Sequence, residues 1–431
     1  MGWGEGEALA LTMTIEQPRA PLPPTRSPGS AGGTGAKRVD LLQRLATHTS
    51  ERAAAGLLRR TRTIDHAEGP WLEVDGRRLL AFCSNDYLGL AGHPQLIAAF
   101  KRVADDEGVG STAAHLVCGH RREHAMLEEA LAEWTGRERA LLFSTGYMAN
   151  LGAMQALLGR GDLCVQDRLN HACLLDGATL AGATLKRYPH GDAAAAARQL
   201  AVEPGAAALL ATDGVFSMDG DRAPLRELAT LCRHEGATLM VDDAHGLGVL
   251  GPDGAGSVAE AGLGMREVPV LMATLGKALG THGAFVAGPA TLIEDLTQFA
   301  RTFVYSTAMP PALAAAALAA VRLARTDGWR REKLAASIAR FRQGAARLDL
   351  PLAPSDTPIQ PLLLGDAAAA LAAATALEER GLLVTAIRPP TVPVGQARLR
   401  VTLSAAHEEE HVDRLLDALA ALPRAHGQAP V

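Results

Sequence analysis

The sequence lacks the features that would place the protein in a membrane or outside the cell. No uninterrupted apolar run of about 18 residues is free of charge and glycine, so we expect no membrane-spanning helix. The N-terminus has no basic segment followed by an apolar stretch and a cleavage site, so no signal peptide is predicted. The five cysteines are scattered without a CxxC pair, which is typical of reduced thiols rather than of a disulfide framework. Together these absences favour a cytoplasmic protein.

An excess of basic charge is also missing. The 431 residues carry a net charge of −5 with an isoelectric point near 6.3, which argues against a nucleic-acid partner. What is present is a composition of 48% hydrophobic and 21% charged residues, typical of a soluble globular protein with a large core. The length suits two or three domains of roughly 150 residues each.

The first segment of the chain is rich in proline and glycine and has no periodic apolar face. Such a segment cannot offset its ordering entropy, so residues 1–37 are predicted to be a disordered leader. A helical pattern begins near Val39, and a hairpin is expected around Trp71–Phe82. We therefore divide the chain into four parts. After the leader, residues 38–84 form a helix and a hairpin that join the small domain. Residues 85–325 form a large domain, and residues 326–431 form the small α+β domain.

Short apolar runs alternate with amphipathic stretches through the predicted large domain. Examples of these runs are residues 140–143, 163–165, 207–211, 239–241 and 270–273. Runs this continuous are typical of strands covered by helices on both faces, so we predict a doubly wound α/β domain with a mostly parallel sheet. In the small domain we expect helices at 330–348 and 367–380, strands at 359–364, 383–387 and 397–402, and a final helix from about residue 407.

Polar and basic residues follow three of these predicted strands. Gly146 lies in a strand–turn–helix segment, whose free N–H groups and helix dipole suit a phosphate. Asp242 and His245 follow another strand, where buried acids and a histidine need a partner such as a metal ion or a protonated ring nitrogen. Lys277 follows a third, where partial desolvation would lower its pKa and make it a nucleophile and base. Each feature alone is weak, because glycine turns and solvated lysines are common.

The combination is more specific than its parts, because ligands of open α/β sheets bind beyond the carboxyl ends of the strands. An anion cradle, an acid that pairs with a pyridinium nitrogen and a lysine able to form a Schiff base are what pyridoxal phosphate needs. The sequence therefore predicts this cofactor, carried on Lys277.

Seven segments carry a resemblance to a known family. They are SNDYLGL at 84–90, LNHACLLDGA at 169–178, DGVFSMDGD at 213–221, VDDAHGLGVLG at 241–251, TLGKALG at 274–280, YSTAMPP at 305–311 and TAIRPPTVP at 385–393. On these segments the chain, from about Leu41 to Leu419, resembles the α-oxoamine synthases, which are fold-type-I pyridoxal-phosphate enzymes. The stretch at 110–120 departs from the family, which is richer in glycine there.

The resemblance implies roles at the cofactor. Lys277 would carry the cofactor as a Schiff base, Asp242 would pair with the ring nitrogen, and His171 would stack on the ring. The other cofactor contacts would be His245 and Ser217 at the phenolic oxygen, and Gly146, Tyr147 and Thr274 at the phosphate.

The resemblance also implies substrate contacts and a homodimer. Asn85 and Arg388 would lie near the amino-acid carboxylate, Thr391 in the acyl region and Arg59 at the acyl donor. Ser306 and Thr307 would reach the cofactor phosphate of the partner chain, although a cap on the helix near Pro310 would explain them equally well.

The activity that the resemblance implies is a decarboxylative acyl transfer. L-Alanine would condense with a pimeloyl thioester, carried by coenzyme A or acyl carrier protein, as in biotin synthesis. Other family members, such as glycine C-acetyltransferase, 5-aminolevulinate synthase and serine palmitoyltransferase, remain alternatives because they share the fold and the cofactor residues. A catalytically silent subunit of this fold would have lost the lysine, and Lys277 is present.

Two motifs suggest a different chemistry, zinc hydrolysis. Residues 407–411 match HExxH and residues 120–124 match HxxEH. The first match puts three acids in the opening turn of a predicted helix, where the helix dipole favours them, and only 20 residues follow it. A chance match to each motif is expected in roughly a few per cent of chains of this size. We therefore predict no metal site.

Overall fold

The structure is a computed structural model that describes residues 39–54, 57–59 and 61–422. The predicted disordered leader, residues 1–37, lies outside the described residues. The chain divides into two compact units, one ending at Arg60 and one beginning at Thr61. The predicted domain boundary near residue 325 falls inside the second unit and stays a prediction.

Helix α1 (Leu41–Ala54) belongs to the first unit and matches the helical pattern that begins near Val39. It begins after Asp40, whose Oδ1 accepts hydrogen bonds from the N–H groups of Leu42 and Gln43. This is the arrangement of an N-terminal cap, which satisfies N–H groups that the helix itself leaves unpaired. The connection of this helix to the small domain stays a prediction.

A seven-stranded sheet forms the centre of the second unit. Its order is β4-β10-β9-β8-β7-β5-β6, and all neighbours are parallel except β10, which is antiparallel to both β4 and β9. The strands are β4 (Arg139–Phe143), β5 (Leu163–Asp167), β6 (Thr184–Tyr188), β7 (Ala208–Asp213), β8 (Thr238–Asp242), β9 (Val270–Thr274) and β10 (Ala284–Gly288). The predicted mostly parallel sheet is confirmed.

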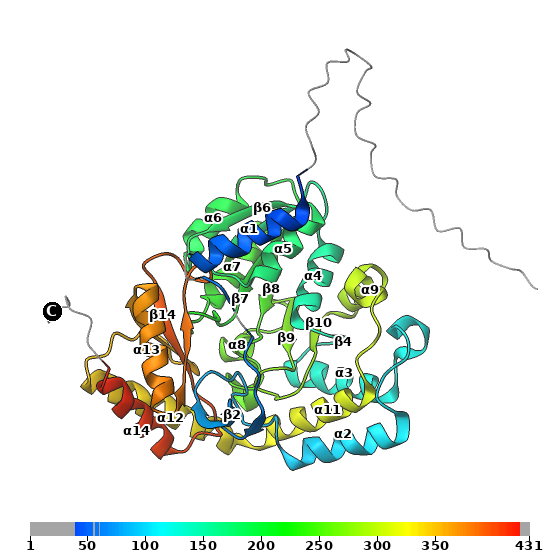
Figure 1. Ribbon diagram of the computed structural model, residues 1–431. Coiled ribbons are helices and arrows are strands. Elements are labelled where there is room, and N and C mark those ends of the chain that lie inside the picture. Colours follow the sequence, from blue (N-terminus) through cyan, green and yellow to red (C-terminus); the bar gives the residue numbers. More distant parts are fainter. Residues whose placement is uncertain (1–38, 55–56, 60, 423–431) are drawn as a thin grey trace, which may run out of the picture. The chain divides into compact units, whose positions relative to one another are not determined.

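Helices cover both faces of this sheet (Figure 1). Met240 on β8 belongs to a core cluster with α4, α5 and α9, whereas its neighbours Leu239 and Val241 belong to a cluster with α6 and α7. Because successive side chains of a strand point to opposite faces, the continuous apolar run at 239–241 serves both layers. The doubly wound arrangement predicted from such runs is therefore present.

The helices of this part of the chain connect the strands and flank the sheet. They are α2 (Pro94–Glu107), the π-helix η1 (His115–Gly119), α3 (Arg122–Thr135), α4 (Gly146–Leu157), α5 (Ala172–Ala181), α6 (Ala193–Leu200), α7 (Leu225–Glu235), the 3₁₀-helix η2 (Pro252–Gly254), α8 (Ser257–Glu260), α9 (Ala290–Phe299), α10 (Arg301–Val304) and α11 (Pro311–Thr326). None of the described helices combines the length and apolar character needed to cross a membrane.

Two smaller sheets lie outside the large one. The hairpin of β2 and β3 joins β1 and β12 in the order β1-β2-β3-β12, and β11-β14-β13 form the other sheet. Figure 1 shows α12, α13 and α14 gathered about β14. The elements are β1 (His66–Glu68), β2 (Trp71–Val74), β3 (Arg77–Ala81), α12 (Gly328–Arg347), β11 (Ile359–Gly365), α13 (Ala367–Glu379), β12 (Leu382–Leu383), β13 (Thr385–Ile387), β14 (Ala397–Thr402) and α14 (Glu409–Ala420).

Three features differ from the sequence-based expectation. Strands β6 and β10 are not among the predicted apolar runs, and the final helix begins at Glu409 rather than at about residue 407. In the glycine-poor stretch at 110–120, Thr112 has a positive φ of 65°. A β-branched residue is strained in this left-handed region, where glycine would be unstrained.

Candidate active site

The carboxyl ends of the parallel strands surround a cavity of ≈ 200 Å³. Its walls contain every residue predicted to hold the cofactor. The lining residues are Gly146, Tyr147, Asn150, His171, Cys173, Asp213, Val215, Ser217, Asp242, Ala244, His245, Met272, Thr274 and Lys277. Because β7, β8 and β9 are adjacent and parallel, the residues that follow them meet at one edge of the sheet.

Asp242 ends β8 and is a buried carboxylate at the floor of this cavity. Its Oδ2 accepts a hydrogen bond of 2.7 Å from Asn150 Nδ2, and its Oδ1 accepts one of 3.0 Å from the N–H of Ala244. Two carboxylate oxygens offer about four acceptor positions, so a further donor can still be accepted. A protonated ring nitrogen could donate a hydrogen bond to the unused acceptor position of Asp242.

Lys277, beyond β9, is joined to a chain of buried hydrogen bonds. Its Nζ lies 2.8 Å from His245 Nε2, and His245 Nδ1 lies 2.6 Å from the hydroxyl of Tyr87. Burial lowers the pKa of Lys277, against the opposing effect of Asp242. Burial also lowers the pKa of His245 well below its usual value, with the charge of Lys277 adding to the effect. His245 is therefore a neutral imidazole at neutral pH.

The direction of donation along this chain follows from its far end. The Tyr87 hydroxyl donates to Asn85 Oδ1 (3.3 Å), because an amide oxygen can only accept. His245 Nδ1 then donates to Tyr87, which leaves Nε2 to accept from Lys277 Nζ. Burial raises the pKa of Tyr87 to about 12, so its proton stays in place. The amine of Lys277 therefore donates a hydrogen bond to the neutral imidazole of His245.

Arg400 on β14 reaches the same chain and was missed by the sequence analysis. It is buried, and it donates to neutral oxygens that include Ser217 O (2.7 Å), Thr402 Oγ1 (3.1 Å) and, more weakly, Asn85 Oδ1 (3.4 Å). Two residues earlier, Arg398 is instead paired with Asp219. A buried guanidinium whose hydrogen bonds to the described residues go to neutral oxygens is suited to a carboxylate ligand.

The N-terminus of α4 borders the cavity opposite Lys277. Thr145 caps this helix, and its Oγ1 accepts from the N–H of Met148. Gly146 and Tyr147 are the first helical residues, whose N–H groups have no partner within the helix. Together with the helix dipole, these N–H groups offer a phosphate site. Thr274, also predicted at the phosphate, already donates its hydroxyl proton to Gly283 O (3.0 Å).

His171 caps α5 and presents its ring at the cavity wall. Its Nδ1 lies 3.4 Å from the N–H of Cys173 and 2.8 Å from the Cys173 thiol. Burial raises the pKa of this thiol, with Asp242 adding to the shift. The thiol is therefore protonated and can donate to Nδ1, which fixes the imidazole plane. A fixed and partly open imidazole face suits stacking on a planar ring, as predicted.

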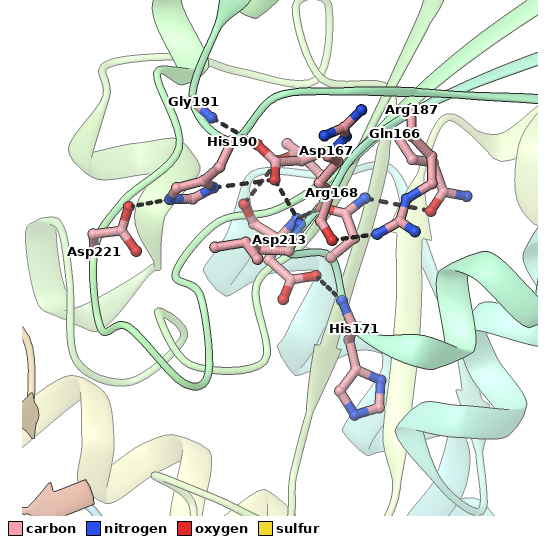
Figure 2. A network of polar contacts seen from close by, with 12 residues as sticks. Gln166, Asp167, Arg168, His171, Arg187, His190, Gly191, Asp213 and Asp221 are labelled. Carbon is pink, nitrogen blue, oxygen red and sulfur yellow. Dashed lines mark hydrogen bonds and ion pairs between the residues drawn. The ribbon is translucent and has the colours of Figure 1, made fainter. Parts of the chain in front are cut away.

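Outside these residues lies a network centred on His190 (Figure 2). His190 Nδ1 contacts Asp167 Oδ1 at 3.0 Å, and its Nε2 contacts Asp221 Oδ2 at 2.7 Å. The two carboxylates raise the pKa of His190 to about 10, although burial alone would lower it. The charged imidazole thus joins the segments that follow β5, β6 and β7. Asp213 continues the network toward the cavity, because its Oδ1 accepts from the N–H of His171 (3.2 Å).

The remaining predicted contacts are not part of the cavity lining. Arg388 and Thr391 follow β13, and Arg59 belongs to the first unit of the chain. Asn85 is also outside the lining but is linked through Tyr87 to His245, which belongs to it. Their roles at the substrates stay predictions.

Ser306 and Thr307 precede α11, whose N-terminal cap is Pro310 with no side-chain cap hydrogen bond. Capping therefore does not explain the two hydroxyls. Thr307 instead forms an isolated bridge with Ala114.

A larger cavity of ≈ 390 Å³ lies elsewhere, and its described walls hold no lysine, histidine or cysteine. Its charged lining residues are Arg222, Arg226, Glu227 and Glu260. The volume of a cavity therefore does not identify the active site of this protein. The hydrogen-bond donors and acceptors around Lys277 do identify it.

The HExxH motif is structural. His407 Nδ1 accepts from the N–H of Ser404 (3.0 Å), its Nε2 donates to Ala81 O (2.9 Å), and its ring stacks on Phe82. His411 Nδ1 accepts from the N–H of Glu408 (3.1 Å) in the cap of α14. Among the described residues, no third histidine, cysteine or carboxylate joins His407 and His411 in a group that could hold a metal ion.

Comparison with known proteins identifies the family. The profile of the family described as aminotransferase class I and II matches residues 77–419. A curated relative named 8-amino-7-oxononanoate synthase, from Alkalilimnicola ehrlichii, is 60% identical over 380 residues, which cover 88% of this chain and 97% of the relative. A relative of the same name from Pseudomonas putida is 60% identical over 376 residues, which cover 87% and 96%.

Solved structures agree with the fold. Serine palmitoyltransferase from Sphingomonas wittichii has a TM-score of 0.85 at 33% identity and covers 89% of this chain and 98% of its own. A structure of SPT with PLP has a TM-score of 0.84 at 28% identity, with the same coverage. The 8-amino-7-oxononanoate synthase of Francisella tularensis has a TM-score of 0.70 at 30% identity and covers 79% and 97%.

The serine palmitoyltransferases share the architecture, but their identity of 28–33% is about half that of the curated relatives. The predicted fold type and the predicted cofactor, pyridoxal phosphate, are both confirmed by these likenesses. The donors and acceptors of the cavity fit that cofactor: an unpaired helix N-terminus, a carboxylate with spare capacity and a buried amine. This chain belongs to the 8-amino-7-oxononanoate synthase family of fold-type-I pyridoxal-phosphate enzymes.

Proposed function

We propose that this protein is an acyltransferase that condenses L-alanine with a pimeloyl thioester, carried by coenzyme A or acyl carrier protein. The products are 8-amino-7-oxononanoate, CO₂ and the free thiol carrier, and the reaction is a step of biotin biosynthesis. The observation that carries this proposal is Lys277 Nζ, buried 2.8 Å from a neutral His245 beside Asp242, in a chain 60% identical to synthases of that name. We expect the reaction to take place in the cytoplasm.

The cofactor, when bound, supplies an electron-withdrawing ring that acidifies the Cα–H bond of an amino acid attached to it. Asp242 stabilises the positive charge on the ring nitrogen, because it is a buried carboxylate with acceptor capacity to spare. The N–H groups of Gly146 and Tyr147 would hold the phosphate, and the imidazole of His171 would stack on the ring. Together with Asp242, these residues would keep the cofactor in one position.

Lys277 is the base for the Cα proton. Its pKa is lowered by burial, so a larger fraction of its amine is neutral and can accept a proton. His245 Nε2 accepts a hydrogen bond from Nζ and fixes its position without adding a second positive charge. The hydrogen-bond chain through Tyr87 and Asn85 keeps His245 in the tautomer that leaves Nε2 unprotonated.

Arg400 and Asn85 bind the carboxylate of alanine in this proposal. Arg400 brings the buried positive charge, and its guanidinium contacts Asn85 Oδ1, one step from Tyr87. Arg388 was predicted at the carboxylate from the resemblance. Arg400 is favoured because its charge lowers the pKa of both Lys277 and His245, which places it close to the reacting amine.

The identity of the amino acid is tested by competition. Purified enzyme with pimeloyl-CoA is supplied with L-alanine, glycine or L-serine, and the condensation products are separated by mass. We expect alanine to be preferred in kcat/KM by about 10-fold or more, the discrimination that one methyl group gives in a closed pocket. A preference for glycine would instead assign the chain to the glycine-using members of the fold, and Lys277→Ala serves as the blank.

We further propose that the enzyme is a homodimer in which Ser306 and Thr307 reach the cofactor phosphate of the partner chain. The support is that neither hydroxyl caps α11, although both lie directly before it. In a two-fold dimer such a contact would build two equivalent sites.

Subunit exchange tests the shared site. A Lys277→Ala chain is mixed with a chain altered to alanine at Ser306 and Thr307. If sites are shared, one site of the heterodimer collects both defects and the other none, so activity returns. A monomer in sedimentation, or no recovery after proven exchange, would contradict the proposal.

A further inference from the structure

Three histidines gather away from the cofactor cavity. His115 begins η1, His120 follows the end of η1, and His124 lies in the first turn of α3. One ligand atom of each can be chosen so that all three lie within 4.8 Å of one another. Among the described residues this is the one group of three or more histidine, cysteine or acidic side chains arranged in this way.

Two of these imidazoles face each other directly. His115 Nδ1 and His120 Nδ1 are 2.9 Å apart, so one donates its proton to the lone pair of the other. Two imidazole nitrogens on one tetrahedral zinc ion lie roughly 3.3 Å apart, given Zn–N bonds of about 2.0–2.1 Å. A shift of a few tenths of an ångström would therefore admit an ion in place of the shared proton.

The ring positions are fixed by their surroundings. His115 stacks on Phe303, with ring centroids 4.9 Å apart and planes inclined by 18°. His124 is buried, and its Nε2 donates to Met309 O while its Nδ1 accepts from the N–H of Arg121, each at 2.8 Å. His120 is the exposed member of the group, so an ion can enter from its side.

A carboxylate lies behind His120, on the side away from His115. Glu128 Oε2 is 3.8 Å from His120 Nε2, and Glu128 Oε1 accepts from the N–H of Leu142 (3.1 Å). A carboxylate that receives the far N–H of a metal-bound imidazole orients the ring and raises its basicity. At 3.8 Å the two atoms are beyond hydrogen-bonding distance, so Glu128 would become the second partner of His120 only after a small approach.

We propose that His115, His120 and His124 form a binding site for a divalent transition-metal ion of the zinc type. Three imidazole nitrogens favour zinc, nickel or copper over magnesium or calcium, which prefer oxygen ligands. The facing Nδ1 atoms of His115 and His120 are available to an ion once the proton between them moves to the far nitrogen of its ring. To bind, His124 gives up one of its two present hydrogen bonds.

This site differs from the one that the HxxEH motif suggested. The motif supplies His120 and His124, but the third ligand is His115, and no hydrolytic role follows. The ion would connect η1 to α3, next to the strained Thr112 and to Met309, which precedes α11. Its expected effect is on stability, because an ion that binds only the folded chain raises the free energy of unfolding.

The test uses tag-free enzyme loaded with pyridoxal phosphate. Zinc is titrated calorimetrically, and cobalt(II) is substituted to record the absorption bands of a tetrahedral nitrogen site. We expect one ion per chain, a rise in Tm with zinc, and an unchanged visible spectrum of the cofactor. His115→Ala and His120→Ala should each weaken zinc binding by about 100-fold, and Glu128→Gln by about 10-fold.

Matched variants keep the test decisive. His66→Ala removes an exposed histidine on β1 and should leave zinc affinity unchanged. Cys118→Ser removes the exposed thiol of η1 and should also change nothing, since loss of binding there would mean a thiolate site instead. His124→Gln should weaken binding as much as His115→Ala, with circular dichroism to check that α3 survives the loss of its cap.

Three results would overturn the proposal. They are full zinc affinity in both His115→Ala and His120→Ala, full affinity in a folded His124→Gln variant, and zinc binding that displaces the cofactor at Lys277. An adventitious surface ion would show itself by equal weakening in His66→Ala.

Discussion

His245 and His190 lie on the same side of the large sheet and differ in charge. His245 contacts the amine of Lys277 and the hydroxyl of Tyr87, and its pKa is lowered well below the usual value. His190 lies between Asp167 and Asp221, and its pKa is raised to about 10 (Figure 2). Burial lowers the pKa of both imidazoles and is the main cause of the shift in His245, to which the charge of Lys277 adds. In His190 two carboxylates outweigh burial, because carboxylates stabilise an imidazolium that a neighbouring cation would oppose.

The difference in charge separates a histidine that serves the reacting amine from a histidine that stabilises the fold. The neutral histidine belongs to a chain in which protons can be held or moved, and that chain ends at the reacting amine. The charged histidine lies outside the cavity lining and joins the segments at the carboxyl ends of β5, β6 and β7. Four tests, with five substitutions between them, break or sharpen this comparison, from the largest expected effect to the smallest.

Lys277→Ala should abolish turnover at the neutral-histidine end. We expect activity to fall by at least about 10⁴-fold, because the general base is lost together with the covalent link to the cofactor. Product formation is measured by mass spectrometry, and borohydride reduction followed by peptide mapping locates the labelled lysine. Lys101→Ala, on the exposed face of α2, is the control and should stay active. Label on any other lysine would refute the role of Lys277.

Asp242→Asn should lower kcat by about 10³-fold while the fold survives, because a charge aimed at the developing transition state is removed without a change of shape. The amide can still accept from Asn150, so far-UV circular dichroism should be unchanged. The readout is kcat together with the visible spectrum of the bound cofactor. A rate near that of the wild type would transfer the role to Asp243, which is also buried.

Arg400→Gln and Arg388→Gln test which arginine binds the carboxylate of alanine. Arg400 was proposed from the structure, and Arg388 was predicted from the sequence. Loss of a charged hydrogen bond to the alanine carboxylate costs about 2 kcal/mol, so KM for alanine should rise about 30-fold in Arg400→Gln. KM should change little in Arg388→Gln. Steady-state kinetics at saturating pimeloyl-CoA gives both values. The opposite ranking would restore Arg388 to the carboxylate.

His190→Gln should change stability rather than catalysis. The folded pKa of about 10 lies above the unfolded value of about 6.5, so the charge stabilises the fold fully below pH 6.5 and its contribution is lost as the pH rises through 10. We expect the variant to lose about 2 kcal/mol at pH 6 and the gap to close toward pH 10. Urea unfolding at several pH values measures it, and a gap independent of pH would mean that packing against Phe216 matters more.

Much of the fold follows from continuous apolar runs, and the misses have physical causes. β6 is half-polar because it is the last strand of the sheet, with one neighbour only. β10 is as apolar as its neighbours, but its antiparallel direction depends on the loops at its ends and leaves no trace in the composition. Burial and period predict that a strand exists, whereas its partner and direction are decided by the whole sheet.

Gly146, Asp242, His245 and Lys277 could be singled out because each lies at or just beyond the end of a predicted strand, whereas the other proposed cofactor contacts, such as His171 and Ser217, came only from the resemblance. Arg400 could not be singled out, because in the alternating segment RLRVT it has the pattern of a solvent-facing residue of a strand. All six residues of β14 are in fact buried, since the loop after β7 covers the face that would meet water. The sequence analysis also missed the grouping of His115 with His120 and His124. A π-helix brings together residues that the spacing of an α-helix would separate.

β14 has a consequence for the order in which the protein is made. Arg398 and Arg400 contact Met218, Asp219 and Ser217, which were synthesised about 180 residues earlier. While a ribosome is still making the chain, the loop after β7 lacks these partners, and the wall of the cavity next to Lys277 is incomplete. Contacts this distant along the chain form late in folding. The cofactor therefore meets a finished pocket only after translation has passed β14, and a chain released before that point keeps the lysine without the arginine beside it.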